Sequence, residues 1–200
     1  MLSSDCFRAL NARNVSIALI GPGGAGKSTA GVLLADRLGI SFLDLDECFR
    51  RRAGDISEYI NRCGYEAYAR ENVETYRSSI HECNRPRVLA LSSGFMTYPR
   101  DIHPEYVTFL GAIEQSPTTF VLIPSLDFDR CVAETVRRQL GRPFARSAEA
   151  EQAAIRERFP TYVGLQSQKI ETMGPLSTIV DALLVAIRGE LSGPAPARYN

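Results

Sequence analysis

The chain has 200 residues, a formal net charge of zero and 44% hydrophobic residues. A chain of this length can bury a full core as one domain, and zero net charge excludes a whole-molecule basic field that would recruit nucleic acid or an anionic membrane. The five cysteines are odd in number and include no CxxC pair, which favours reduced thiols over a disulfide framework or a zinc site. We therefore expect a cytoplasmic protein that binds neither nucleic acid nor membrane.

Short apolar runs alternate with helical patterns along the first half of the chain. Residues 15–20 (VSIALI) predict a strand buried on both faces, which the glycine- and proline-rich run at 21–24 ends. A helix is predicted from Lys27 to a stop at Gly39, followed by a strand at 41–45. The elements expected next are helices at 46–53, 56–63 and 66–82 and a strand at 87–91.

The second half continues this alternation. A turn and helix are expected at 99–115, a strand at 118–123 and an arginine-rich helix at 127–140. The last elements expected are a helix at 148–169 that bends at Pro160, a strand at 169–173 and a helix at 175–191. Strands that alternate with helices imply a parallel sheet wrapped on both faces. We predict one α/β domain over residues 1–200, with a disordered tail at 192–200.

Residues 21–28 (GPGGAGKS) match the phosphate-binding pattern GxxxxGK[ST], between the first predicted strand and the first predicted helix. Glycines let backbone N–H groups turn onto a β-phosphate, and the helix N-terminus adds partial positive charge. Lys27 can bridge the β- and γ-phosphates, and the Ser28 hydroxyl can take a Mg²⁺ position. We therefore predict that ATP and Mg²⁺ are bound by Gly23, Gly24, Ala25, Gly26, Lys27, Ser28 and Thr29.

This loop does not name the phosphoryl acceptor, because motors, GTPases and small-molecule kinases share it. No NKxD-like guanine signature follows the fourth predicted strand, which disfavours a GTPase. The third predicted strand ends in Ser92 and Ser93, where a motor or ordinary ATPase would place an acid. The nearest acids are Asp44 and Asp46, at the end of the second predicted strand.

Asp44 and Asp46 are two residues apart, so in an extended chain their carboxylates would point the same way. One could hold a water on Mg²⁺ while the other orients the acceptor hydroxyl or takes its proton. Alternatively, Asp46 caps the N-terminus of the following helix, which does not exclude the first role.

Arginines flank a Gly-Arg-Pro break in residues 136–151 (VRRQLGRPFARSAEAE). A solvated arginine face is the usual explanation of such a run. The glycine, the proline and the small residues favour instead a mobile lid, whose charges face the phosphates and which keeps water out. We expect Arg142 to be the lid arginine.

With the loop, the acidic pair and the lid, the chain resembles the shikimate kinases, small P-loop enzymes of the nucleoside-monophosphate-kinase type. The resemblance covers roughly residues 15–190 and rests on GPGGAGKST, FLDLDE, RRAGDISEYINRCGYEAY, VLALSSGF, GRPF and RERFPTY. It implies that Asp44 lies on the magnesium side and that Asp46 contacts the acceptor hydroxyl. It also implies that Arg142 is the lid arginine on ATP and that Arg158 binds the acceptor's carboxylate.

The chain departs from the family pattern around the acceptor. The family has a glycine triplet where this chain has Ser92, Ser93 and Gly94. It also carries an FRxxE motif, whose arginine and glutamate positions fall here on Ala69 and Asn72.

The neighbouring residues of this predicted helix allow two interpretations. Arg70 lies about 100° around the helix from the family's arginine position and replaces that arginine only if the register shifts. Tyr65, Tyr68 and Asn72 fall near one helical face, as core residues or as a neutral hydrogen-bonding wall. The predicted acceptor-binding residues are Asp46, Tyr68, Arg70, Asn72, Ser92, Ser93, Gly94 and Arg158.

The predicted function is ATP- and Mg²⁺-dependent transfer of a phosphoryl group to a hydroxyl of a small anionic molecule, with shikimate the first candidate by resemblance. Lys27, Arg142 and Mg²⁺ would neutralise the transferring group while Asp46 orients the acceptor. The alternatives are a kinase of another polyol, amino-alcohol or natural-product intermediate, a nucleoside-monophosphate kinase, and a regulatory module that binds ATP without transfer. We expect a monomer or a weak homodimer.

Overall fold

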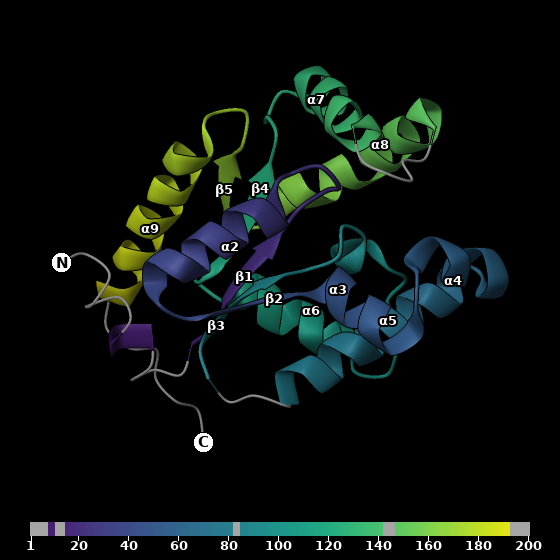
Figure 1. Ribbon diagram of the computed structural model, residues 1–200, viewed down its shortest axis with the longest axis horizontal. Coiled ribbons are helices and arrows are strands. Elements are labelled where there is room, and N and C mark those ends of the chain that lie inside the picture. The colour runs from purple at the N-terminus through teal and green to yellow at the C-terminus, as the bar shows by residue number, and fades with distance from the viewer. Residues whose placement is uncertain (1–7, 11–14, 82–84, 142–146, 193–200) are drawn as a thin grey trace.

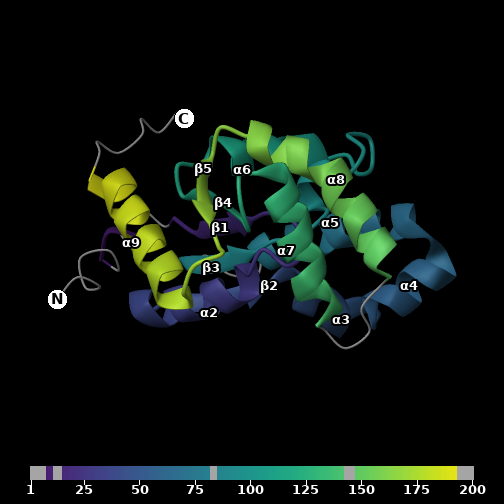
Figure 2. The ribbon, with the colours of Figure 1, turned by 90° about the horizontal axis from the view of Figure 1, so that it is seen from above.

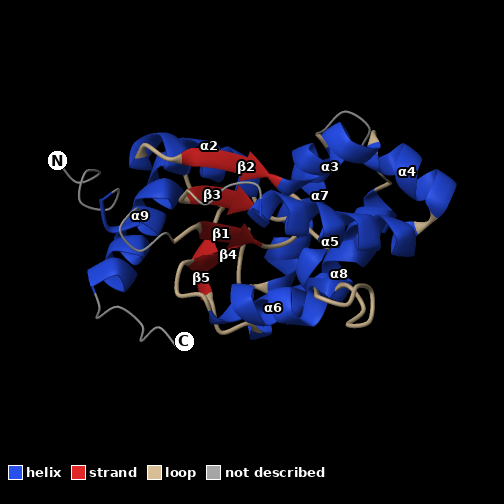
Figure 3. Ribbon diagram, turned by 90° about the horizontal axis from the view of Figure 1, so that it is seen from below, coloured by secondary structure: helices blue, strands red, loops and turns tan. Residues whose placement is uncertain are grey.

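Five parallel strands form one sheet in the order β2-β3-β1-β4-β5 within the part of the chain that the computed structural model describes, residues 8–10, 15–81, 85–141 and 147–192 (Figure 1). The arrows of β1, β2 and β3 point the same way in Figure 3, toward the side where α3 and α7 lie. The strands are β1 (Ile17–Ile20), β2 (Ser41–Asp44), β3 (Arg87–Ala90), β4 (Thr119–Ile123) and β5 (Gln168–Glu171).

Helices cover both faces of this sheet, as Figure 2 shows from above. One face packs against α2 (Lys27–Leu38) and α9 (Leu176–Ser192). The other packs against α3 (Leu45–Ala53), α5 (Tyr65–His81), the 3₁₀ turn η1 (Phe95–Thr97) and α6 (Tyr106–Gln115). The remaining helices are α4 (Ile56–Cys63), α7 (Phe128–Leu140) and α8 (Ala148–Gly164).

The three central strands, β3, β1 and β4, are covered on both faces and build the core, which explains why their sequences are mainly apolar. Every residue of β3 and β4 is buried. Side chains alternate between the two faces, so Phe120 and Leu122 join the cluster under α2 and α9 while Val121 joins the cluster under α5 and α6. The predicted α/β fold with a parallel sheet is confirmed.

Some element boundaries differ from the predicted ones for local reasons. The helix predicted at 148–169 ends at Gly164, because Gln168 pairs with Phe120 and begins β5. The helix predicted from Asp46 starts one residue earlier, at Leu45, with Asp44 as its N-cap. Residues 142–146 of the predicted lid and residues 193–200 of the predicted tail lie outside the described residues. In the described part, no helix is both long and apolar enough to cross a membrane.

Candidate active site

The phosphate loop follows β1 and leads into α2, as predicted. Gly24 and Gly26 have φ values of 72° and 85°, in the left-handed region that favours glycine. A Cβ atom on Gly21 would lie 2.0 Å from the carbonyl oxygen of Leu122, so only glycine lets the loop pass β4 this closely. The Lys27 ammonium lies over the loop, and its Nζ donates to the Gly21 carbonyl at 2.7 Å.

Asp44 joins the start of α2 to the start of α3. The Ser28 hydroxyl donates to Asp44 Oδ2 at 2.5 Å. Its Oδ1 accepts from the backbone N–H groups of Asp46 at 3.0 Å and Glu47 at 3.2 Å. The N-cap role considered for Asp46 therefore belongs to Asp44, and the Asp46 side chain is left for another task.

Asp46 ends a chain of hydrogen bonds between buried and half-buried side chains, which we call the Asp46 relay: Asp46, Ser92, Asn72 and Tyr98. The Tyr98 hydroxyl donates to Asn72 Oδ1 at 3.1 Å, and Asn72 Nδ2 donates to Ser92 Oγ at 3.0 Å. Ser92 Oγ then donates to Asp46 Oδ1 at 2.5 Å. Every bond runs toward Asp46, so its carboxylate is the terminal acceptor.

The position of Asp46 differs from the expected one. It lies in the first turn of α3 while Asp44 ends β2, so the two carboxylates do not share an extended segment. Asp44 accepts from Ser28 at the phosphate loop, whereas Asp46 accepts from Ser92 at the end of β3.

Two buried tyrosines keep their protons, Tyr68 beside this relay and Tyr98 within it. Burial is the main cause that raises the pKa of Tyr68, and the nearby Asp46 carboxylate raises it further. Burial likewise holds the pKa of Tyr98 well above its usual value. Tyr98 is therefore a neutral donor at the far end of the relay. Tyr68 packs its ring against Phe49, 5.0 Å between centroids, so it belongs to the core and also borders the Asp46 charge.

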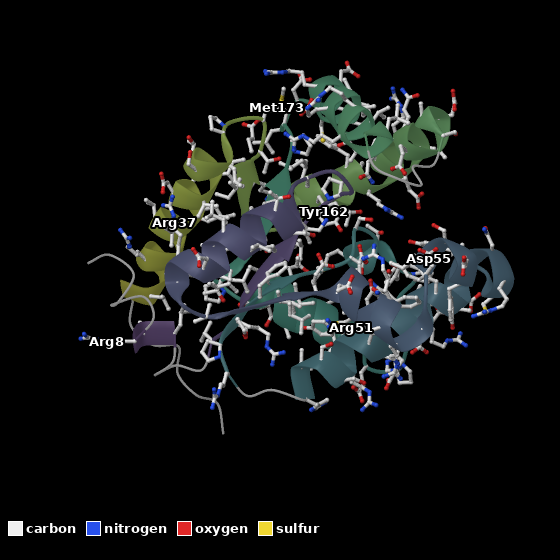
Figure 4. The ribbon with its side chains drawn as sticks, in the orientation of Figure 1. Arg8, Arg37, Arg51, Asp55, Tyr162 and Met173 are labelled. Carbon is white, nitrogen blue, oxygen red and sulfur yellow. The ribbon has the colours of Figure 1, made fainter. Side chains whose placement is uncertain are left out.

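Arg158 lies on the other side of the turn after β3. Its guanidinium donates to Ser93 Oγ at 3.2 Å and to the Tyr65 hydroxyl at 3.1 Å. The Tyr162 hydroxyl donates to the Ser93 carbonyl at 2.9 Å; Figure 4 labels this side chain near the centre of the molecule. A Cβ on Gly94 would come within 2.6 Å of the Tyr65 hydroxyl, so the glycine keeps room for this contact.

The two consecutive serines therefore serve opposite charges. Ser92 donates to a carboxylate, and Ser93 accepts from a guanidinium. The turn holds Asp46 and Arg158 on its two sides, beside the phosphate loop. A small molecule with a hydroxyl and an acidic group has a polar partner for each.

Arg138 was not singled out from the sequence. Its guanidinium donates to the Gly24 carbonyl at 3.1 Å and to the Thr172 carbonyl at 2.6 Å, and its Nε bonds Glu134 at 2.6 Å. It borders a cavity of about 310 Å³ beside the phosphate loop, also lined by Thr29 and Ile179. The only sequence signal for this residue was the arginine run itself.

Two arginines predicted for the site are not among the described side chains around the phosphate loop and the turn after β3. Arg70 donates to the Ile102 carbonyl at 3.2 Å and pairs with Glu66 at 3.0 Å, and its side chain is 60% exposed. Its described contacts therefore hold it on the outside of α5, away from the Asp46 relay. Ala69, at the family's arginine position, is fully buried in the core. Arg142 lies outside the described residues.

A family model described as shikimate kinase matches residues 23–188. The chain belongs to the shikimate kinase family. Relatives named shikimate kinase include those of Thermobifida fusca, 32% identical over 77% of this chain and 83% of the relative, and Mycobacterium avium, 33% identical over 77% and 82%. The resemblance inferred from the motifs is thus confirmed.

Other matches are shorter or more distant. The chain spans only 6% of the pentafunctional AROM polypeptide of Schizosaccharomyces pombe, 37% identical over 94 residues, or 46% of this chain. The solved shikimate kinase of Acinetobacter baumannii in complex with shikimate has a TM-score of 0.71 at 24% identity, over 92% of this chain and 98% of that one. This likeness shows a shared fold.

Proposed function

We propose that this member of the shikimate kinase family transfers the γ-phosphoryl group of ATP to a hydroxyl of shikimate. The observation that carries the proposal is the turn after β3, where Ser92 donates to Asp46 and Ser93 accepts from Arg158. A hydroxy acid fits this pair of partners, with its hydroxyl at the carboxylate and its carboxylate at the guanidinium. The names of the Thermobifida fusca and Mycobacterium avium relatives support shikimate as that acid.

The residues beside the phosphate loop fit a nucleotide with Mg²⁺. Ser28 and Asp44 bring a hydroxyl and a carboxylate oxygen within 2.5 Å of each other, and these hard oxygen donors suit Mg²⁺. When bound, the ion would neutralise charge on the phosphates. Lys27 would turn from the loop carbonyls to the β- and γ-phosphates, and Arg142 would add charge from the lid at 136–151. The cavity bordered by Arg138 would hold the base.

Asp46 would orient the acceptor hydroxyl and take its proton. Its Oδ1 accepts the hydrogen bond from Ser92, and among the described residues no donor bonds to Oδ2. Oδ2 would therefore accept the proton of the substrate's hydroxyl. As the acceptor oxygen bonds to the γ-phosphorus, the bond from that phosphorus to the β–γ bridging oxygen breaks and ADP leaves. The relay fixes the carboxylate in one orientation, so that positioning supplies much of the catalysis.

An acceptor panel tests this proposal. Shikimate, gluconate, AMP, CMP, UMP and TMP are compared by ADP release, with the Asp46→Asn variant as the control for catalysis at this site. We expect turnover with shikimate and its loss in the variant. Turnover of a nucleotide alone would assign the chain to nucleoside-monophosphate kinases. ATP binding without ADP release over the whole panel would indicate a regulatory module.

One observation favours a second candidate, a kinase of another small hydroxy acid. The family's arginine position holds the buried Ala69, and the wall formed by Asn72 and Ser92 is neutral. Among the described residues, Arg158 then supplies the guanidinium at the turn after β3. A site with fewer charged groups and more neutral hydrogen-bonding groups suits an acceptor with more hydroxyls. The ratio of kcat/KM for gluconate and shikimate separates the two candidates.

We further propose a cytoplasmic enzyme that acts as a monomer or a weak homodimer. The described cysteines, Cys48, Cys63 and Cys131, are free thiols, as a reducing compartment requires. Size-exclusion chromatography over a range of concentrations tests the oligomeric state.

A further inference from the structure

A second cavity, of about 270 Å³, lies at the end of the sheet opposite the phosphate loop. It is lined by the first residues of three strands, Ile17, Arg87 and Thr119, and by residues of α5 and α6. The phosphate loop, Asp44 and the turn after β3 follow the other ends of these strands. A four-residue strand is about 13 Å long, so the cavity is separate from the proposed active site.

The polar lining of this cavity is basic. Arg87 is only 7% exposed and donates to the Ser79 carbonyl at 3.0 Å, while Arg85 is exposed at the rim. Ser16, Ser79 and Ser116 add hydroxyl groups, and none of the described residues that line the cavity is acidic. This composition favours an anionic ligand.

Thr119 supplies a second, independent observation. Its side chain is 1% exposed, and Oγ1 is buried with no hydrogen-bond partner. Strand alternation places it on the face of Val121, toward α5 and α6, because Phe120 joins the opposite cluster. It therefore faces the cavity. A buried hydroxyl without a partner costs free energy, which a ligand that hydrogen-bonds to it would offset.

The rest of the lining is apolar. Tyr76 and Ile80 of α5, Ile113 of α6 and Leu89 of β3 form this wall. Burial raises the pKa of Tyr76 to about 12, so the phenol adds no charge at neutral pH. The volume is just below the range of about 300–1,000 Å³ typical of ligand pockets, which limits the ligand to a compact body.

We propose that this cavity binds a small carboxylate with one compact apolar ring. The carboxylate lies between Arg85 and the Thr119 hydroxyl, and the ring packs on the Tyr76 and Ile113 wall. This site is distinct from the acceptor site at Arg158 and does not depend on the proposed reaction.

Benzoate is the probe, with benzamide as its neutral counterpart, and binding to the full chain is measured by titration calorimetry. We expect saturable binding of benzoate and at least about tenfold weaker binding of benzamide, because a charge-assisted hydrogen bond is about twice as strong as a neutral one. Equal binding of the two would overturn the carboxylate assignment, and absence of saturable benzoate binding would overturn the site.

Three variants locate the probe. Thr119→Val removes the unpartnered hydroxyl at nearly constant volume, and Arg85→Gln changes an exposed side chain, so neither variant should lower the free energy of unfolding measured in urea. Each should weaken benzoate binding about tenfold, whereas Arg158→Met should leave it unchanged. Binding that is lost in Arg158→Met and retained in the other two would place benzoate in the acceptor site and refute the proposal.

Discussion

Replacing Ser92 with alanine tests the Asp46 relay at its central link. The hydroxyl of Ser92 donates to Asp46 Oδ1 at 2.5 Å and accepts from Asn72 Nδ2 at 3.0 Å. Ser92→Ala removes both bonds and leaves the Asp46 carboxylate, Tyr98 and the backbone of the turn in place. It therefore perturbs the orientation of the proposed catalytic carboxylate without removing it.

The expected size follows from these two bonds. A hydrogen bond to a charged group contributes about 1.5–3 kcal/mol, so loss of the constraint on Asp46 should lower kcat by about 10- to 150-fold. Asn72 is fully buried, and its amide N–H would lose its partner. A buried N–H without a partner should lower the free energy of unfolding by about 1–3 kcal/mol, and urea denaturation measures this loss separately from activity.

The neighbouring serine provides a matched control. Ser93→Ala keeps the relay and removes the oxygen that accepts from Arg158 at 3.2 Å. ADP release with shikimate as acceptor should then show a raised shikimate KM and a nearly unchanged kcat. If the folded Ser92→Ala enzyme keeps kcat within about twofold of the wild type, the relay does not position Asp46 and the reasoning is wrong.

Three further predictions concern charged side chains. Asp46→Asn should lower kcat by at least about a hundredfold with little change in the ATP dissociation constant, because the amide cannot take the acceptor's proton; a kcat within twofold of the wild type would remove Asp46 from catalysis. Arg158→Ala should raise the shikimate KM about tenfold or more, and a change confined to ATP affinity would move this residue to the lid. Glu134 accepts from Arg137 and Arg138, and these bonds, the one from Arg137 first, lower its pKa from 4.5 to about 2. The ionised Glu134 therefore contributes to stability above about pH 4.5, and this contribution is lost as the pH falls toward 2. Glu134→Gln should lower the free energy of unfolding by about 1 kcal/mol at pH 7 and by almost nothing at pH 2. An equal loss at both pH values would contradict the assignment.

The features that the sequence predicts well are those set by local chemistry. The phosphate loop is a contiguous motif between a buried strand and a helix, and the short apolar runs of β1, β3 and β4 are typical of strands covered on both faces. A helix boundary differs from the predicted one where two neighbouring residues could each cap the helix, as at α3, which Asp44 caps rather than Asp46.

The wall formed by Asn72 and Ser92 could be predicted only in part, because it depends on contacts between distant segments. Asn72 and Ser92 were expected near the acceptor, but their shared hydrogen bond and its direction toward Asp46 follow from the packing of α5 against the turn after β3. The position of Arg70 likewise depends on the register of α5, which points it toward the Ile102 carbonyl. Spacing along one helix does not contain this information.

The serine at position 92 links these observations. A glycine there, as in the family pattern, has no hydroxyl to join Asn72 to Asp46, so the relay requires this departure. The buried Ala69 and the neutral Asn72 stand at the positions of the arginine and the glutamate of the family motif, so neither position brings a charge to α5. In this chain a serine hydroxyl therefore positions the Asp46 carboxylate, and among the described residues Arg158 supplies the positive charge at the turn after β3.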